Sequence, residues 1–354
     1  MLKIGVVGLR RGMSFVNMFG RHPECQVVAV CDKQGDLAAR VAQERDIPGV
    51  YEDFEQFLNH DLDVVVVATP PAFHVKQSVA ALKSGRHVLS EVPAATSLEE
   101  CHTLAKAVKE SSAKYMMGAN PNFWAFIESW REMVRQGRLG KIIYGEAEYI
   151  SGAIPGGPTL RRTADGKPTW RAFLPPIHYC THSLGPILSL TDDRCVTAVG
   201  MHTGSNIDTE YGTIDMEVGL FKTEQGAVIK ILTGFALRRQ PGFHYYSVYG
   251  TKGCLEKKRD GAETVAYFED IPNLHGMMNI PINTMHKGLP GWAAMGGHGS
   301  AEYVMIQGFI EAILEDKDPP VDVYKALDYT APGLCAHISA EQGGKPVEVP
   351  DFRS

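Results

Sequence analysis

The chain has 354 residues, of which 44% are hydrophobic and 21% are charged. This length argues for two domains, and the ordinary globular composition argues against disorder. A net charge of −6 gives no reason to expect nucleic acid or an anionic membrane as a partner. Seven scattered cysteines without a CxxC pair fit free thiols in a reducing compartment. Because the first residues are typical of a strand and no apolar run approaches the ~20 residues of a membrane span, we expect a cytoplasmic protein.

Short apolar runs alternate with amphipathic stretches over the first 118 residues. The pattern predicts strands at Leu2–Val7, Val27–Cys31, Val64–Ala68, His87–Leu89 and Tyr115–Met117. It predicts helices at Asp36–Arg45, Asp53–Asn59, Val75–Ser84 and Leu98–Ser111. The last helix follows a capping box, Ser97-Leu-Glu-Glu100. Strand–helix alternation of this kind specifies a doubly wound parallel sheet, so we predict a Rossmann domain over residues 1–119.

The first predicted strand leads into a glycine-containing turn, Gly8-Leu-Arg-Arg-Gly12. A dinucleotide site needs a tight turn there, with a backbone bare enough for a pyrophosphate to approach the next helix. Gly8 and Gly12 meet this requirement, whereas Arg10 and Arg11 stand near the position of the usual middle glycine. Asp32 ends the second strand, where a carboxylate accepts hydrogen bonds from the adenosine ribose and repels a 2′-phosphate. We therefore predict that these five residues bind NAD in preference to NADP; a capping or turn role is the alternative for Asp32.

The next two strand ends also carry loops typical of a cofactor site. One is Ala68-Thr-Pro-Pro71, with His74 opening the next helix, and the other is Glu91-Val-Pro93. The carboxyl ends of strands line the ligand crevice in an open α/β sheet. Proline-terminated strands without a ligand are the alternative interpretation. We predict as further cofactor-binding residues Thr69, Pro70, His74 and Glu91.

After Ile142 the pattern changes to long alternating stretches that are typical of a half-buried antiparallel sheet. Examples are Ile214–Phe221, Ala227–Gly234 and Tyr245–Tyr249. We predict that residues 120–354 form a substrate-binding, catalytic α/β domain with an open, mostly antiparallel sheet. The C-terminal segment of this domain can pack back on the first domain.

Before this sheet lies the segment 178–190 (HYCTHSLGPILSL), whose apolar end predicts a helix. At helical spacing Tyr179 and His182 share a face, so their polar ends can converge on one substrate. Histidine is poised for proton transfer near neutral pH, and tyrosine can act as an acid or, beside a cation, as a base. Packing without chemistry is the alternative for this pair. His178 and His182 also have metal-ligand spacing, but a third ligand with fitting spacing is not evident, so we predict no metal site.

Other residues of the second domain are candidates for holding a substrate. Trp170 could stack on a sugar ring, and Arg171 beside it could bind a carboxylate or sulfonate. Arg161, Arg162 and Lys167 belong to the same loop, for which a solvated surface role is the alternative. His298 lies in a glycine-containing run that could approach a ligand or simply lead into a helix. We predict as substrate-binding residues Trp170, Arg171, His178 and His298.

Taken as a set, these motifs resemble the Gfo/Idh/MocA family, the glucose–fructose oxidoreductase and inositol dehydrogenase group. The resemblance spans essentially the whole chain, through GLRRG at 8–12, Cys31-Asp32, Ala68-Thr-Pro-Pro71, SEVPAATSLEE at 90–100, GRLGKI at 137–142, YGTKG at 249–253 and KPVEVPDF at 345–352. It implies an NAD(P)-binding Rossmann domain, followed by a domain whose open sheet carries the substrate site. It also implies a homo-oligomer formed through that sheet.

The third loop departs from the family's dehydrogenases, which typically have Glu-Lys-Pro with a lysine that assists proton transfer. Val92 stands in the lysine's place and can neither donate nor accept a proton. The chain is similar in this to the NAD-dependent glycosidases typified by α-N-acetylgalactosaminidases, which it also resembles at Met116-Met117 with Asn120, at 133–137, 179–186 and 298–305. This resemblance implies Tyr179 and His182 as the catalytic pair and Asn120 as part of the cofactor site. The chain departs from the subgroup at Phe123, where a tyrosine is expected, and over 151–175.

These observations lead to one leading hypothesis and two alternatives. The leading hypothesis and the first alternative both take a small sugar or glycoside as substrate. In the leading hypothesis, a redox-assisted glycosidase uses NAD⁺ to take hydride from the sugar's C3, and the resulting ketone acidifies the C2 proton. Tyr179 or His182 removes that proton, the aglycone leaves C1, water adds to the enone, and hydride return restores NAD⁺. The first alternative is an NAD-dependent sugar or cyclitol dehydrogenase in which His182 replaces the lysine. The second is a non-catalytic NAD-binding sensor or scaffold.

Overall fold

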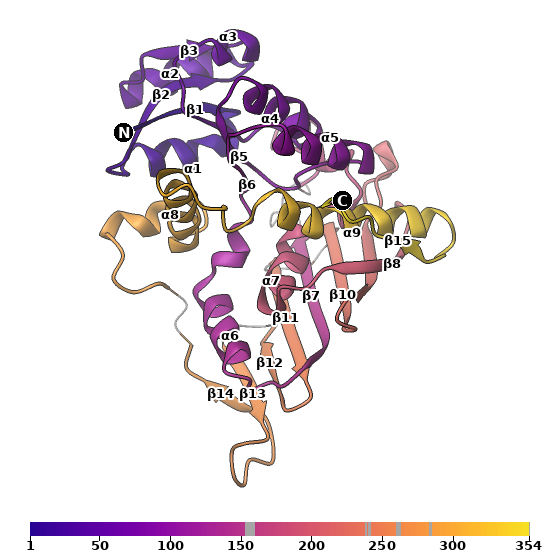
Figure 1. The fold of residues 1–354 in the computed structure, drawn as a ribbon. Coiled ribbons are helices and arrows are strands. Elements are labelled where there is room, and N and C mark those ends of the chain that lie inside the picture. Colours follow the sequence, from indigo (N-terminus) through magenta and orange to yellow (C-terminus); the bar gives the residue numbers. More distant parts are fainter. Residues whose placement is uncertain (153–159, 238, 240–241, 260–262, 283–284, 354) are drawn as a thin grey trace. The chain divides into compact units, whose positions relative to one another are not determined.

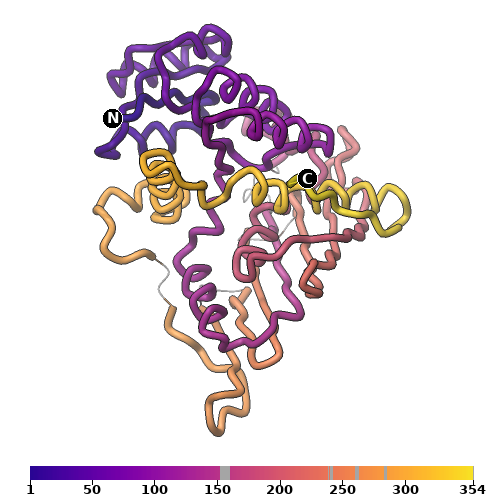
Figure 2. The backbone as a smooth tube through the Cα atoms, viewed as in Figure 1, coloured from indigo at the N-terminus to yellow at the C-terminus, as the bar shows by residue number. Residues whose placement is uncertain are grey.

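The computed structural model describes residues 1–152, 160–237, 239, 242–259, 263–282 and 285–353 (Figure 1). The chain forms two compact units, each assembled from separated stretches of sequence. The first unit comprises Met1–Phe123, His286–Leu327 and Phe352–Ser354, and the second comprises Trp124–Met285 and Asp328–Asp351. The predicted boundary between the two domains, after residue 119, stays a prediction. Figure 2 traces the backbone through both units.

The first unit is built on a six-stranded, all-parallel sheet with the order β3-β2-β1-β4-β5-β6. Its strands are β1 (Leu2–Val7), β2 (Cys25–Cys31), β3 (Gly49–Tyr51), β4 (Val64–Val67), β5 (His87–Ser90) and β6 (Tyr115–Met117). Its helices are α1 (Leu9–Phe19), α2 (Gly35–Arg45), α3 (Phe54–Leu58), α4 (His74–Lys83), α5 (Leu98–Lys109) and α8 (Ser300–Leu314). Short 3₁₀ turns are η1 (Pro71–Phe73), η2 (Asn120–Phe123) and η6 (Gly291–Met295). The predicted doubly wound parallel sheet is confirmed.

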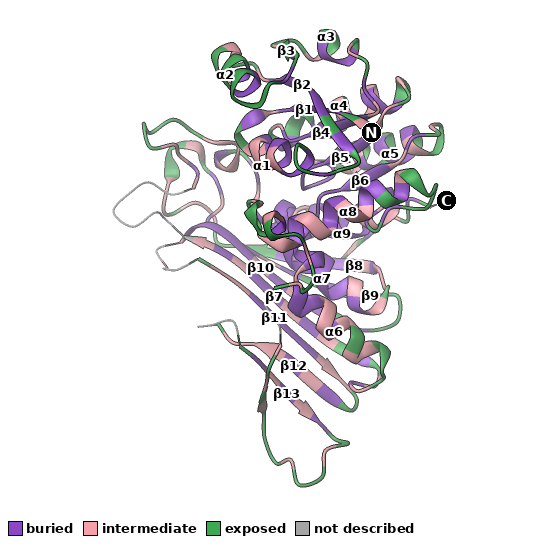
Figure 3. Cartoon of the chain, turned by 90° about the vertical axis from the view of Figure 1, so that its left-hand side faces the viewer, coloured by how far each residue is buried: buried purple, intermediate pink, exposed green. Residues whose placement is uncertain are grey.

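Burial explains why this sheet forms from these residues. The run Val64–Val67 is entirely buried, as expected for a central strand covered on both faces (Figure 3). The capping box of α5 forms in a modified way. The Ser97 hydroxyl accepts from the Glu100 backbone N–H at 3.1 Å, while the Glu100 carboxylate accepts from the Thr96 N–H at 2.7 Å. The sequence pattern missed β3, because three residues are too few for a periodic signal.

The second unit is built on a nine-stranded sheet with the order β14-β13-β12-β11-β7-β10-β9-β8-β15. Its strands are β7 (Ile142–Gly152), β8 (Cys195–His202), β9 (Met216–Thr223), β10 (Val228–Leu237), β11 (Phe243–Gly250), β12 (Gly253–Lys257), β13 (Thr264–Phe268), β14 (Met278–Ile280) and β15 (Val347–Glu348). Its helices are α6 (Ala125–Arg135), α7 (Thr181–Thr191) and most of α9 (Val323–Glu341), with 3₁₀ turns η3 (Trp170–Ala172), η4 (Pro176–Tyr179) and η5 (Thr209–Tyr211). Among the described strands of this sheet, β7 and β10 alone pair in parallel, so the predicted mostly antiparallel sheet is confirmed.

Helices pack on one face of this sheet at positions where glycines allow close approach. A Cβ at Gly145 in β7 would lie 2.8 Å from Ile187 of α7. A Cβ at Gly200 in β8 would lie 1.9 Å from the carbonyl oxygen of Ala336 in α9. Among the described helices, none has both the length and the apolar composition that a membrane span requires.

We expect Gly200→Ala to destabilise the protein by about 1–3 kcal/mol, because the added methyl group forces α9 away from β8. Urea unfolding followed by circular dichroism measures the change. The matched control is Gly276→Ala, where the new methyl group would meet nothing within 4 Å. Equal unfolding midpoints for the two variants would contradict the packing described.

Candidate active site

The turn between β1 and α1 requires glycine for two separate reasons. Gly8 has φ 87°, and a Cβ on it would lie 2.6 Å from the Ala68 carbonyl oxygen. A Cβ on Gly12 would lie 2.8 Å from Val6, so this glycine lets α1 approach β1. The first turn of α1 contains no acidic residue and has no side-chain cap. Its N-terminus is therefore suited to an anion such as a pyrophosphate.

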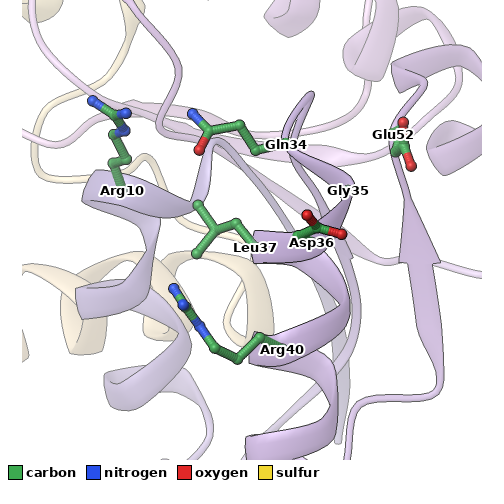
Figure 4. A pocket seen from close by; sticks show the side chains of 7 residues that line it. All are labelled: Arg10, Gln34, Gly35, Asp36, Leu37, Arg40 and Glu52. Atoms are coloured by element: carbon green, nitrogen blue, oxygen red, sulfur yellow. The ribbon is translucent and has the colours of Figure 1, made fainter.

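Asp32, at the carboxyl end of β2, joins two neighbouring loops. One carboxylate oxygen accepts from the Leu9 backbone N–H at 2.7 Å, and the other accepts from the Gln34 N–H at 2.9 Å. The side chain thus orders the turn itself, and each oxygen still has a lone pair for a ribose hydroxyl. Beside it lies a hollow, drawn in Figure 4, lined by Arg10, Gln34, Gly35, Asp36, Leu37, Arg40 and Glu52.

Arg11 is neutralised by carboxylates from distant parts of the first unit. Its guanidinium donates to Glu91 at 2.7 Å and to Glu302 at 2.6 Å. Ser14 also donates to Glu302, and His298 Nδ1 lies 3.4 Å from Arg11. Although burial raises the pKa of Glu302, the hydrogen bond with His298 and the charge of Arg11 lower it to about 2. We call these five residues the Arg11 cluster; it includes His298, which we predicted to bind substrate.

The second and third loops are held together by His74. This buried side chain lies 2.7 Å from the Thr69 carbonyl oxygen and 2.9 Å from that of Pro93. Pro70, exposed, directly precedes η1. Val92 is buried, which agrees with an apolar role in this loop.

Asn120 carries two buried polar atoms in the first unit that could bind a ligand. It is 1% exposed, and neither its amide nitrogen nor its carbonyl oxygen has a hydrogen-bond partner among the described residues. Buried carboxamides of this kind are normally satisfied, so both atoms are available to a bound molecule. Together with the glycine turn, the α1 N-terminus and Asp32, it makes a site that fits a dinucleotide.

In the second unit, Tyr179 and His182 come together as neighbours. Tyr179 ends η4 and His182 lies in the first turn of α7, and their rings pack edge to face with centroids 4.8 Å apart. The Tyr246 hydroxyl donates to the His182 backbone carbonyl at 2.5 Å, which fixes the start of α7. Both members of the pair are buried.

Two further residues that we had not predicted lie beside this pair. The Tyr149 ring lies 5.5 Å from Tyr179 and 5.9 Å from His182, and the His244 ring lies 4.6 Å from Tyr149. Tyr149 in β7 and His244 in β11 are direct cross-strand partners, so the alternation of the sheet puts them on one face. Both are half-buried and so remain accessible to a ligand.

Trp170 and Arg171 complete the surroundings of Tyr179. The centroid of the Tyr179 ring lies 5.4 Å from that of Trp170 and 5.7 Å from that of Phe235. The Arg171 guanidinium lies 4.1 Å from the Trp170 ring centroid and 5.8 Å from that of Tyr179. We call the six rings of Tyr149, Trp170, Tyr179, His182, Phe235 and His244 the aromatic cluster.

The other cations of the 151–175 loop are paired with acidic residues, while residues 153–159 of this loop lie outside the described part of the chain. Arg161 pairs with Asp215 at 3.4 Å, and Lys167 pairs with Asp165 at 2.9 Å. Arg162 pairs with Asp208 at 2.8 Å and also contacts Glu210. Arg171 differs from these three, because its charge lies against aromatic faces.

His178 lies in different surroundings from Tyr179. Its ring packs edge-on against His337 at 5.0 Å, and burial together with His337 lowers the pKa of His178 to about 3. His337 in turn lies 2.7 Å from Glu217, whose other oxygen accepts from the Ile177 N–H at 3.2 Å. A substrate-binding role for His178 stays a prediction. Among the described residues, no group of three or more His, Cys, Asp or Glu side chains is arranged to hold a metal ion.

Comparison with known proteins bears on both units. Residues 2–119 match the family described as oxidoreductase, NAD-binding Rossmann fold (GFO_IDH_MocA), and residues 189–354 match the C-terminal domain of glycosyl hydrolase 109. The chain is therefore similar to the Gfo/Idh/MocA oxidoreductases in its NAD-binding part. Its C-terminal part resembles glycosyl hydrolase family 109, as we predicted, so both matches are to enzymes of the oxidoreductase or NAD-dependent glycosidase type.

Individual relatives align along nearly the whole chain. A glycosyl hydrolase family 109 protein of Solibacter usitatus is 29% identical, covering 99% of this chain and 88% of the relative. An α-N-acetylgalactosaminidase of Shewanella oneidensis is 23% identical, covering 99% and 85%. A levoglucosan dehydrogenase, solved with NADH and levoglucosan, has a TM-score of 0.80 at 19% identity and covers 99% of each chain. At this identity the structural likeness shows the fold alone.

The His337–Glu217 pair predicts a pH-dependent stability. The hydrogen bond with Glu217 raises the pKa of His337 against the effect of burial. The pair therefore stabilises the fold fully below about pH 6.5, and this contribution is lost as pH rises through the folded pKa. We expect His337→Asn to cost on the order of 1–2 kcal/mol at pH 6 and less at pH 9.

Urea unfolding at a series of pH values measures this difference. The matched control is His202→Asn, because His202 pairs with Glu341 at 2.9 Å but Glu341 is largely exposed. A pH-independent loss of stability in His337→Asn would contradict the assignment.

Proposed function

We propose that this protein is an NAD-dependent, sugar-active enzyme, and specifically a redox-assisted glycosidase that recycles its NAD. The observation that carries the proposal is the packing of Tyr179 against His182 at 4.8 Å, in a chain whose third loop has Val92 where the family's dehydrogenases have lysine. The match of residues 189–354 to glycosyl hydrolase 109 supports it. So does the relative described as an α-N-acetylgalactosaminidase.

When bound, NAD⁺ supplies an acceptor for hydride from the sugar's C3 and returns that hydride after the glycosidic bond is cleaved. The C3 ketone makes the C2 proton acidic, and Tyr179 or His182 removes it. The C1–O bond then breaks and the aglycone leaves with a proton. Water adds at C1 of the enone, and C2 regains a proton. Tyr179 and His182 thus act as the acid–base pair of the reaction.

The surroundings of Tyr179 suit it to accept a proton. The Arg171 guanidinium lies 5.8 Å from its ring, and a nearby cation favours the phenolate. Trp170 offers a ring face for stacking on a sugar. We further propose that Arg171 holds a negatively charged or hydroxyl substituent of the substrate.

The proposal gives the first unit's polar residues their roles. The backbone donors of the turn that holds Gly8, Arg10, Arg11 and Gly12 would receive the pyrophosphate. Asp32 would bind the adenosine ribose, and Asn120 would supply its unsatisfied amide. Thr69, Pro70, His74 and Glu91 would shape the loops around the rest of the cofactor.

We also propose a cytoplasmic homo-oligomer, formed through the sheet of the second unit. All seven cysteines are free thiols, six of them buried, which suits a reducing compartment. The oligomer rests on the family resemblance alone.

The choice between NAD and NADP can be tested at Asp32. We expect NAD⁺ to bind more tightly than NADP⁺, because the carboxylate repels a 2′-phosphate, and Asp32→Asn to narrow this preference by about tenfold. Isothermal titration calorimetry measures both affinities. The matched control is Asp36→Asn, which removes a carboxylate from the first turn of α2 in the hollow beside Asp32. Equal affinities in the unaltered protein would contradict the preference.

The reaction can be tested by incubating the protein with a panel of α- and β-glycosides in D₂O. We expect free sugar deuterated at C2, with no net change in absorbance at 340 nm. Tyr179→Phe and His182→Ala should each lower turnover by about 10²-fold or more. Tyr144→Phe is the control, because Tyr144 lies on the same strand as Tyr149 but bonds Glu146 at 3.2 Å.

Other outcomes identify the alternatives. Stoichiometric NADH with a keto-sugar and an intact glycosidic bond would mean a dehydrogenase in which His182 replaces the lysine. The fold shared with levoglucosan dehydrogenase makes this the second candidate. If the unaltered protein and the two variants all show no turnover on any sugar, the protein is a non-catalytic sensor or scaffold.

A further inference from the structure

The Arg11 cluster ties a distant segment to the dinucleotide turn. The segment Gly296–Gly299 precedes α8, and Gly299 takes φ 62° where the helix begins. The Gly297 backbone N–H donates to the Ser14 hydroxyl at 2.8 Å. Ser14 and Arg11 lie three residues apart on α1, so they share one face of that helix. The segment is therefore fixed against the first two turns of α1.

Glu302, in the first turn of α8, completes the attachment. It accepts from both Arg11 and Ser14, and its side chain is 0% exposed. Arg11 carries the connection on to Glu91 in the third loop. One guanidinium thus joins the glycine turn, the third loop and α8, all within the first unit.

The glycines of the segment allow this close fit. A Cβ on Gly296 would lie 2.3 Å from the Glu302 carboxylate. A Cβ on Gly297 would lie 3.2 Å from the Ser14 hydroxyl and 3.4 Å from Arg11. His298, between them and α8, lies 3.9 Å from Glu302. A side chain at either glycine would press into the polar contacts.

Separation of α8 from α1 would leave a buried charge without its partners. Glu302 is buried and ionised, so lifting α8 away from α1 would leave its carboxylate without Arg11 and Ser14. Arg11 would keep Glu91 and the Phe15 ring, which lies 4.6 Å from its guanidinium carbon. The contacts of Glu302 with Arg11 and Ser14 therefore hold α8 against α1.

We propose that Glu302, with Ser14 and His298, forms a clasp that holds the Gly296–Gly299 segment beside the bound dinucleotide and slows its release. The inference rests on the proposed cofactor role of the glycine turn. Slow release suits an enzyme in which one cofactor molecule takes the hydride and then gives it back to the sugar, whereas a dehydrogenase must exchange its cofactor at every turnover. Glu302, Ser14 and His298 are positioning residues in this account.

The test is the rate of NADH release from the full-length protein in the absence of sugar. NADH bound to the protein is chased with excess NAD⁺ in a stopped-flow instrument, and nicotinamide fluorescence is followed. We expect Glu302→Gln and Ser14→Ala to raise the dissociation rate constant by about tenfold or more, since each loses hydrogen bonds with a charged partner. Hydrogen exchange at the Gly297 amide should rise in parallel.

The matched control is Gln307→Ala, which removes a 2.8 Å hydrogen bond between α8 and His22 but leaves the cluster intact. It should release NADH at the unaltered rate. If both cluster variants remain folded and release NADH no faster than the control, the clasp is wrong while the cofactor site stands. If the unaltered protein binds no NADH, the cofactor proposal and the clasp both fail.

Discussion

The arrangement of the first unit depends on the close approach of Gly8 to Ala68. Gly8 has φ 87°, and a Cβ on it would lie only 2.6 Å from the Ala68 carbonyl oxygen, so no side chain fits at this position. This contact lets the ends of β1 and β4 meet, and the neighbouring loops then follow. Asp32 ties the glycine turn to the loop after β2 through two backbone donors, and Arg11 reaches the third loop through Glu91. The N-terminus of α1, which has no side-chain cap, lies where these loops converge. This arrangement is the physical basis of the dinucleotide proposal.

In the second unit, the proposed chemistry depends on how the start of α7 is held. Tyr246 bonds the His182 carbonyl, and Glu217 accepts from the Ile177 N–H just before Tyr179. These two bonds come from β11 and β9 and anchor the η4–α7 turn to the sheet. The buried Tyr179–His182 pair then lies beside the half-buried Tyr149 and His244. These anchors explain why two adjacent turns, rather than a sheet edge, present the proposed acid–base groups.

Local sequence patterns predicted the helices and strands well, but they did not predict contacts between residues that are distant in sequence. The Rossmann sheet and the antiparallel sheet followed from strand and helix periodicity, and the i, i+3 spacing brought Tyr179 and His182 together. Arg11 stands in a phosphate-binding motif, but its partners lie 80 and 291 residues away, which no local pattern reveals. Tyr149 and His244 meet only through the register of β7 and β11. Residue identity likewise could not show that His178 packs against His337 and not beside Tyr179.

In the proposed reaction, hydride leaves the sugar's C3 and returns to the same carbon. A glycoside carrying deuterium at C3 tests it directly, with excess unlabelled NADH present in solution. The account predicts that the released sugar keeps its deuterium at C3, because the cofactor stays bound between the two transfers. Loss of the label to free NADH, with accumulation of a keto-sugar, would contradict the account and identify an ordinary dehydrogenase.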